Sequence, residues 1–87
     1  MKHLKNKVAA ITGAGSGIGQ ALAINLAKEG SHLALSDVNK KGLTETLKLL
    51  KGFSVNITHQ TLDVSDKDAV YAWADKVVED HGSVNMI

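Results

Sequence analysis

The sequence predicts an α/β fold in which a parallel sheet is flanked by helices, in the order β-α-β-α-β-α-β with the last unit incomplete. Short apolar runs alternate with amphipathic stretches, and this unit repeats roughly every 25–30 residues, which is typical of strand–helix–strand crossovers. Glycine also follows each predicted helix, at Gly30, Gly52 and Gly82, where helices commonly end. Crossovers of this kind join parallel strands.

The first unit is a strand from about Lys7 to Thr12 followed by a helix from Gly17 to Glu29. Within the strand, the unbroken apolar run Val8–Ile11 suits burial on both faces of a sheet. In the helix, Ile18, Leu22 and Leu26 recur every four residues. This spacing predicts that they form the face that lies on the sheet.

The second unit is a strand from His32 to Asp37 followed by a helix from Asn39 to Leu50. Gly42 weakens this helix near its start, because glycine is a poor helix former. One side of the helix carries leucines at helical spacing, and these are Leu43, Leu47 and Leu50.

The third unit is a strand from Ser54 to Leu62 and a helix from about Ser65 to His81. Alternating side chains along the strand predict an edge strand with one face partly wet. Ser65 and Asp68 resemble a capping box at the start of the helix. Its expected buried stripe consists of Val70, Trp73 and Val77. A fourth apolar run, 84–87, begins a further strand.

Composition excludes several classes of function. Ten basic residues against nine acidic ones give a formal net charge of +1, so there is no electrostatic footprint for nucleic acid. The chain has no cysteine and its four histidines are far apart, so we expect no metal site. No segment has the eighteen or so apolar residues that a membrane span needs. We therefore expect a cytoplasmic protein without membrane or nucleic-acid partners.

The glycine-rich segment between the first strand and the first helix is the strongest functional signal. Gly13 suits the turn that leaves the strand, Gly17 would let a phosphate approach the backbone, and Gly19 would bring the helix close to the sheet. Ser16 offers a hydroxyl beside the phosphates. The unpaired N–H groups at the start of the helix would attract an anion. A glycine-rich turn without a ligand would show the same pattern.

Asp37 is the second signal, since it ends the second strand eighteen positions after Gly19. A carboxylate at this position can accept hydrogen bonds from both hydroxyls of an adenosine ribose. It would also repel a 2′-phosphate, which favours NAD over NADP. No lysine or arginine stands at Ser16 or Val38 to offset that repulsion. The structural alternative is that Asp37 caps the next helix.

Asp63 and Val64 follow the third strand and give the third signal. In a parallel sheet they would share an edge with Gly13 and Asp37, which is where ligands bind. The carboxylate could hold the amino group of adenine, and the next backbone N–H could reach a ring nitrogen. Alternatively, Asp63 merely begins the following turn.

Three segments together resemble the first part of a classical short-chain dehydrogenase/reductase: Thr12-Gly-Ala-Gly-Ser-Gly-Ile-Gly19, Asp37, and Leu62-Asp-Val64. The resemblance covers essentially the whole chain. It implies a Rossmann-type fold, bound NAD(H), and a parent enzyme that oxidises alcohols or reduces carbonyls. It also implies that the pyrophosphate is lined by Gly13, Ser16, Gly17, Ile18 and Gly19, the adenosine ribose by Asp37 and Val38, and the adenine by Asp63 and Val64.

By the same resemblance, residues 1–87 are the N-terminal part of a single dinucleotide-binding domain that ends inside or at the start of the fourth strand. The family's catalytic serine and Tyr-x-x-x-Lys pair have no counterpart in these residues. Tyr71 does not take the place of the catalytic tyrosine, because the residue four positions after it is Asp75 and not lysine. No catalytic residue is therefore assigned. We expect the isolated chain to be inactive as a dehydrogenase.

Two other functions remain open from the sequence. Gly13, Gly15 and Gly17 also fit the glycine pattern of adenosylmethionine-dependent methyltransferases, although Ile11 stands where those enzymes usually carry an acid. The chain could instead be a non-catalytic nucleotide-binding module that associates with itself. The unpaired outer edge of strand 84–87 would provide the contact.

Overall fold

The structure, a computed structural model, describes residues 6–82 and 85–86 and confirms the predicted α/β fold. Four parallel strands form one sheet in the order β3-β2-β1-β4. The elements are β1 Val8–Thr12, α1 Gly17–Lys28, β2 His32–Asp37, α2 Lys40–Leu49, β3 Ile57–Thr61, α3 Lys67–His81 and β4 Asn85–Met86. The edge position predicted for the third strand is confirmed, because β3 pairs only with β2 among the described residues.

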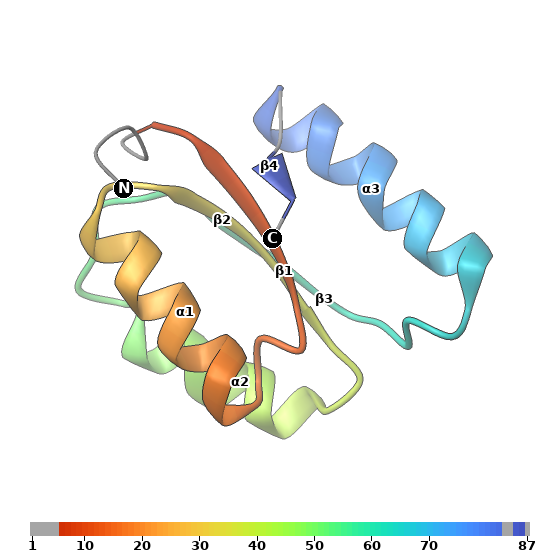
Figure 1. The fold of residues 1–87 in the computed structure, drawn as a ribbon, viewed down its shortest axis with the longest axis horizontal. Coiled ribbons are helices and arrows are strands. Elements are labelled where there is room, and N and C mark those ends of the chain that lie inside the picture. The colour runs from red at the N-terminus through yellow and green to blue at the C-terminus, as the bar shows by residue number, and fades with distance from the viewer. Residues whose placement is uncertain (1–5, 83–84, 87) are drawn as a thin grey trace.

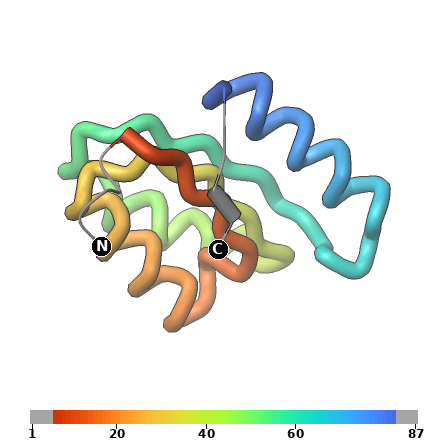
Figure 2. The backbone as a smooth tube through the Cα atoms, turned by 45° about the horizontal axis from the view of Figure 1, so that its top comes forward, coloured from red at the N-terminus to blue at the C-terminus, as the bar shows by residue number. Residues whose placement is uncertain are grey.

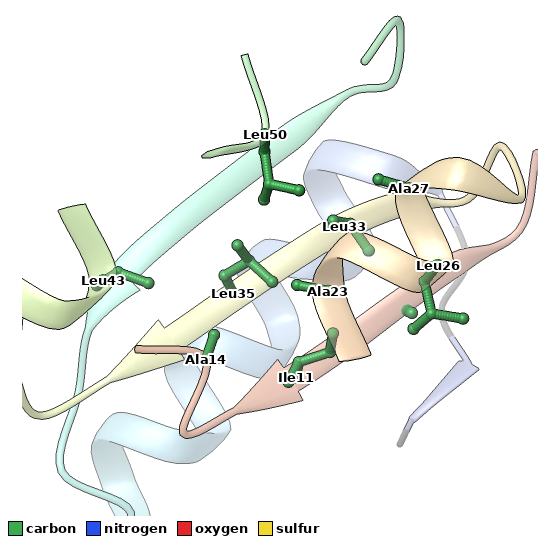
Figure 3. Close-up of a cluster of buried hydrophobic side chains, with 10 residues drawn as sticks. Ile11, Ala14, Ala23, Leu26, Ala27, Leu33, Leu35, Leu43 and Leu50 are labelled. Atoms are coloured by element: carbon green, nitrogen blue, oxygen red, sulfur yellow. The ribbon is translucent and has the colours of Figure 1, made fainter. Parts of the chain in front are cut away.

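Helices cover both faces of the sheet, with α1 and α2 on one side and α3 on the other (Figures 1 and 2). Alternate side chains of the two central strands, β1 and β2, point to opposite faces of the sheet. Ile11 and Leu35 belong to the cluster under α1 and α2 (Figure 3), whereas Ala10 and Ala34 belong to the cluster under α3. Burial on both faces of the sheet explains why the first four residues of β1, Val8–Ile11, are all apolar.

The predicted apolar stripes of α2 and α3 are confirmed. Leu43 and Leu50 are buried beneath α2, and Trp73 and Val77 are buried beneath α3. The intervening Leu47 and Val70 are partly buried against the same clusters.

The stripe predicted for α1 is wrong at Ile18, whose side chain is 87% exposed. The buried residues of this helix are Gly19, Ala23, Leu26 and Ala27. The helix therefore turns three small residues toward the sheet, together with Leu26, which the predicted stripe included. A Cβ on Gly19 would overlap the carbonyl of Gly13, so the first turn of the helix lies directly on the preceding loop and Ile18 points away from it.

Two boundaries differ from the sequence prediction by more than one residue. The third strand begins at Ile57 instead of Ser54. The capping box predicted at Ser65 is wrong, because Asp66 is the N-cap of α3 and accepts a 3.1 Å hydrogen bond from the N–H of Ala69. Ser65 is bonded instead to the carboxylate of Asp63.

The predicted fourth strand is described only at Asn85–Met86, which pair with Ala9 and Ala10 of β1. Val84 and Ile87 lie outside the described residues. Across the described part of the chain, no helix has the length and apolar character needed to cross a bilayer.

Candidate nucleotide-binding site

The loops that follow β1, β2 and β3 meet at one edge of the sheet. The strands are parallel and in register there, with Thr12 beside Ser36 and Asp37 beside Thr61. The predicted site residues belong to these three loops, to the first turn of α1 or, for Asp37, to the last position of β2. The carboxyl ends of parallel strands are the usual place for a ligand in an open α/β sheet.

The first loop is a tight turn that presents the start of α1. Gly13 has φ +68°, a conformation that favours glycine. The Oγ of Ser16 donates a 2.7 Å hydrogen bond to the carbonyl oxygen of Gly13, and it makes no capping bond to α1. In contrast, the side chains of Asn39 and Asp66 cap α2 and α3. The first N–H groups of α1 are therefore not satisfied by a side-chain cap, which suits an anion.

Gly17 and Gly19 differ in what surrounds them. A Cβ on Gly17 would have no heavy atom within 4 Å, whereas one on Gly19 would overlap the backbone of Gly13. Gly19 therefore permits the helix to pack on the loop. Gly17 leaves open space beside the helix N-terminus, where a side chain would otherwise project.

Asp37 joins the second loop to the first. Its Oδ2 accepts a 2.7 Å hydrogen bond from the N–H of Gly15, and its Oδ1 accepts a 2.8 Å bond from the N–H of Asn39. The N-cap of α2 is Asn39, whose side chain accepts from the N–H of Gly42, so the alternative in which Asp37 caps this helix is wrong. The carboxylate is instead fixed against the glycine-rich turn.

Asp63 forms its hydrogen bonds within its own loop. Its Oδ1 accepts from the N–H of Ser65 at 2.9 Å and from the Oγ of Ser65 at 2.7 Å. The backbone bond, and then the hydroxyl bond, hold the pKa of the Asp63 carboxyl below its ordinary value. The carboxyl is therefore an anionic acceptor at neutral pH, and it also organises the turn that leads to α3.

Each of the three loop regions exposes one branched apolar side chain. The exposed fractions are 87% for Ile18, 66% for Val38 and 60% for Val64. Large apolar side chains left in water at the carboxyl edge of a sheet offer contact area to a ligand with apolar faces.

The first loop is fixed against α2 through Gly15, Gly42 and Thr46, none of which is among the predicted cofactor-binding residues. A Cβ on Gly42 would lie 2.6 Å from the carbonyl oxygen of Gly15, and a Cβ on Gly15 would lie 2.6 Å from the N of Leu43. Gly42 therefore lets α2 touch the loop. Its position near the start of a helix, where glycine is unfavourable, was the available signal. Thr46 is fully buried and donates to the carbonyl of Ala14 at 2.8 Å, which no sequence pattern indicated.

The profile of the short chain dehydrogenase family matches residues 7–87, and the chain belongs to this family. It is 46% identical over its whole length to the putative oxidoreductase SadH of Mycobacterium tuberculosis and covers 32% of that protein. It is 40% identical to human epidermal retinol dehydrogenase 2, with 99% of this chain and 28% of the relative aligned. The chain thus spans about a third of the length of these curated relatives.

Solved structures show the same fold. A short-chain dehydrogenase/reductase from Burkholderia phymatum in complex with NAD superposes with a TM-score of 0.91 at 38% identity, covering 99% of this chain and 31% of the other. An NAD⁺-bound xylitol dehydrogenase gives a TM-score of 0.92 at 35% identity, covering 98% and 33%. The family match and these two structures support NAD as the cofactor and do not favour the methyltransferase alternative.

Proposed function

We propose that this chain binds the adenosine diphosphate half of NAD(H) at the carboxyl edge of its sheet. The observation that carries the proposal is the Gly15–Asp37 hydrogen bond, which fixes a carboxylate beside a glycine-rich turn. That turn leads into a helix N-terminus without a side-chain cap. A diphosphate needs the anion site, and a ribose diol needs the fixed acceptor.

The first loop would hold the pyrophosphate. Gly13 shapes the turn and Gly17 leaves the space in which a phosphate can approach the backbone. Ser16 and Ile18 stand at the start of α1 beside that space. Gly19 acts indirectly, since it allows the helix to pack against the loop.

The second and third loops would hold the nucleoside. Asp37 accepts from the ribose hydroxyls, and Val38 contacts the same part of the nucleoside. Val38 and Val64 are both exposed. Val64 would contact a flat face of adenine, whose burial is favourable because that face is apolar. Asp63, kept ionised by its bonds to Ser65, would accept from the amino group of adenine.

In the whole protein, NAD would accept a hydride from an alcohol, and NADH would return one to a carbonyl compound. The residues of this chain bind and orient the cofactor in that reaction. No residue of the chain is proposed as its general base, and we propose that residues 1–87 alone do not oxidise alcohols. Formation of NADH above the blank by the purified chain would contradict this part of the proposal.

Ligand-dependent melting tests the cofactor. The chain is heated with NAD, with NADP and with adenosylmethionine, each at the same concentration. A ligand that binds only the folded state raises the melting temperature according to its concentration and affinity. We expect the largest rise with NAD, a smaller one with NADP and none with adenosylmethionine. A rise with adenosylmethionine alone would instead favour a methyltransferase-type site.

Self-association is a separate proposal. Among the described residues, β4 lies at the edge of the sheet opposite β3, and unpaired strand edges favour association. A monomeric mass in light scattering at high protein concentration would contradict it.

We also propose a cytoplasmic location, which is supported by the composition and is tested by fractionation of cells that produce the protein.

A further inference from the structure

The peptide group between Ala14 and Gly15 is held from two sides. Its carbonyl oxygen accepts a 2.8 Å hydrogen bond from the Oγ1 of Thr46, and its N–H donates a 2.7 Å bond to the Oδ2 of Asp37. The carbonyl and the N–H of a trans peptide point in opposite directions. The peptide group is therefore fixed between α2, which carries Thr46, and the end of β2, which carries Asp37.

The hydroxyl of Thr46 is buried and is part of a wider set of contacts. The side chain is fully buried, and Oγ1 also accepts a 3.1 Å hydrogen bond from the Nε2 of Gln20 on α1. Its distance to the helical carbonyl oxygen of Gly42 is 3.2 Å, longer than its distance to Ala14. One hydroxyl thus joins the first loop, α1 and α2.

Little free space remains around the Ala14–Gly15 peptide. Ala14 is fully buried, and a Cβ on either Gly15 or Gly42 would come within 2.6 Å of the opposing backbone. A buried carbonyl that loses its donor is left without a partner, which is more costly than the mean worth of a hydrogen bond. Loss of the Thr46 hydroxyl would therefore favour a shift of the Ala14–Gly15 peptide toward other donors.

We propose that Thr46 is a positioning residue for the cofactor, an inference that rests on the proposed function. It does not touch the cofactor. It fixes the Ala14–Gly15 peptide, and through the N–H of Gly15 it also fixes the carboxylate of Asp37. A single buried hydroxyl would then preorganise both the pyrophosphate loop and the ribose acceptor, which lowers the cost of ordering them when NAD binds.

The test compares Thr46→Val with Thr44→Val. Both variants replace a hydroxyl with a methyl group on α2. Thr44 is exposed and its Oγ1 donates only to the helical carbonyl of Lys40 among the described residues, so it is the matched control. Two quantities are measured at a temperature at which every variant is folded: the dissociation constant of NAD, and the amide hydrogen exchange of the individual residues.

For Thr46→Val we expect the dissociation constant of NAD to rise about tenfold. We also expect faster exchange at Ala14 and Gly15 with unchanged exchange at Ala34 in the centre of β2. Thr44→Val should change neither quantity, and Thr46→Ser, which keeps the hydroxyl, should restore both. The inference is overturned if Thr46→Val binds NAD as tightly as Thr44→Val, or if its exchange rises equally throughout the sheet.

Gln20→Met provides the test if Thr46→Val does not fold. It removes the Nε2 donor to Thr46 from a partly buried side chain, and we expect the same local exchange pattern with a smaller loss of affinity. Unchanged exchange and affinity would overturn the inference. If the unmodified chain does not bind NAD, the proposed function fails and the cofactor role of Thr46 fails with it, while the exchange measurement still decides whether Thr46 holds the loop.

Discussion

The N–H of Gly15 donates a 2.7 Å hydrogen bond to the Oδ2 of Asp37, across 22 positions of sequence. This bond links the loop after β1 to the end of β2. It also orients the carboxylate, because the other oxygen is held by the N–H of Asn39. The carboxylate that we propose as the acceptor for a ribose diol is thus held in place before any ligand arrives, and preorganisation of this kind favours binding.

Asp37→Asn should weaken the preference for NAD over NADP. The amide carries no charge to repel a 2′-phosphate, and its single oxygen cannot serve both N–H groups that the carboxylate now satisfies. We expect the ratio of the two dissociation constants, NADP over NAD, to fall by about tenfold or more. Unfolding free energy should drop by about 1 kcal/mol. Calorimetric titration with both nucleotides measures the ratio.

The control for Asp37→Asn is Asp75→Asn, which removes the same charge from an exposed position on α3. It should leave the ratio of dissociation constants unchanged. An equal change in both variants would mean that net charge, and not the position of Asp37, sets the preference.

Gly17→Ala should separate binding from folding. An added Cβ meets no heavy atom within 4 Å, and alanine is the better helix former by up to about 1 kcal/mol. The unfolding free energy should therefore stay the same or rise slightly. The methyl group would occupy the space proposed for the pyrophosphate, so we expect NAD to bind about tenfold more weakly.

Gly52→Ala is the matched control for Gly17→Ala, since a Cβ there also has no neighbour within 4 Å and Gly52 lies in the turn after α2, outside the proposed site. NAD affinity should not change in this variant. If Gly17→Ala binds NAD as well as Gly52→Ala does, the pyrophosphate does not lie beside Gly17.

Ser36→Ala should not destabilise the fold. The Oγ of Ser36 is fully buried and has no hydrogen-bond partner among the described residues. Burying an unpaired hydroxyl is unfavourable, so its removal should leave the unfolding free energy unchanged or raise it by about 1 kcal/mol. Thr46→Val removes an equally buried hydroxyl that is hydrogen-bonded, so this variant should have a lower unfolding free energy than the unmodified chain. Urea denaturation compares the two, and a clear loss of stability in Ser36→Ala would reveal a partner for the hydroxyl.

His81 should make the fold less stable in mild acid. Burial holds the pKa of its imidazole below the ordinary 6.5, and nearby His32 acts in the same direction against the opposing effect of Asp80. The unfolded chain therefore binds the proton more readily than the folded one. This contribution to stability is complete above pH 6.5 and is lost as the pH falls through the lowered pKa of the folded state.

Urea midpoints at pH 7.5 and pH 5.5 test the role of His81. The imidazole Nε2 lies 2.9 Å from the Oγ1 of Thr58, and His81→Gln keeps a hydrogen-bonding group that does not titrate. The difference between the two midpoints should be smaller in this variant than in the unmodified chain. An equal difference in both would show that other groups cause the pH dependence.

Periodicity predicted the strands and helices well because it reports burial directly. The leucines of α2 and the Trp73 stripe of α3 are buried as expected. For α1, Ile18-Leu22-Leu26 and the small residues Gly19 and Ala23 lie on adjacent faces of the same helix. Periodicity alone favoured the larger side chains, but the backbone of the preceding loop leaves room only for glycine at position 19.

The contacts that fix the loops could not be predicted in the same way. Gly15 meets Gly42 and Thr46 reaches Ala14 only because the fold brings the loop after β1 against α2. Similarly, Ser65 was a reasonable helix cap by sequence, but the carboxylate of Asp63 competes for its hydroxyl and its N–H. Local sequence therefore predicted the residues of the candidate site, whereas the tertiary contacts determine which of their groups are free to bind.

Residue-resolved NMR titration of the chain with NAD tests the central claim most directly. We expect saturable shifts of backbone amide signals confined to Gly13–Gly19, Asp37–Val38 and Asp63–Val64, with little change on the β3–α3 surface around Thr58 and Lys76. Absence of shifts at millimolar NAD, or shifts that map to a different part of the molecule, would contradict the account.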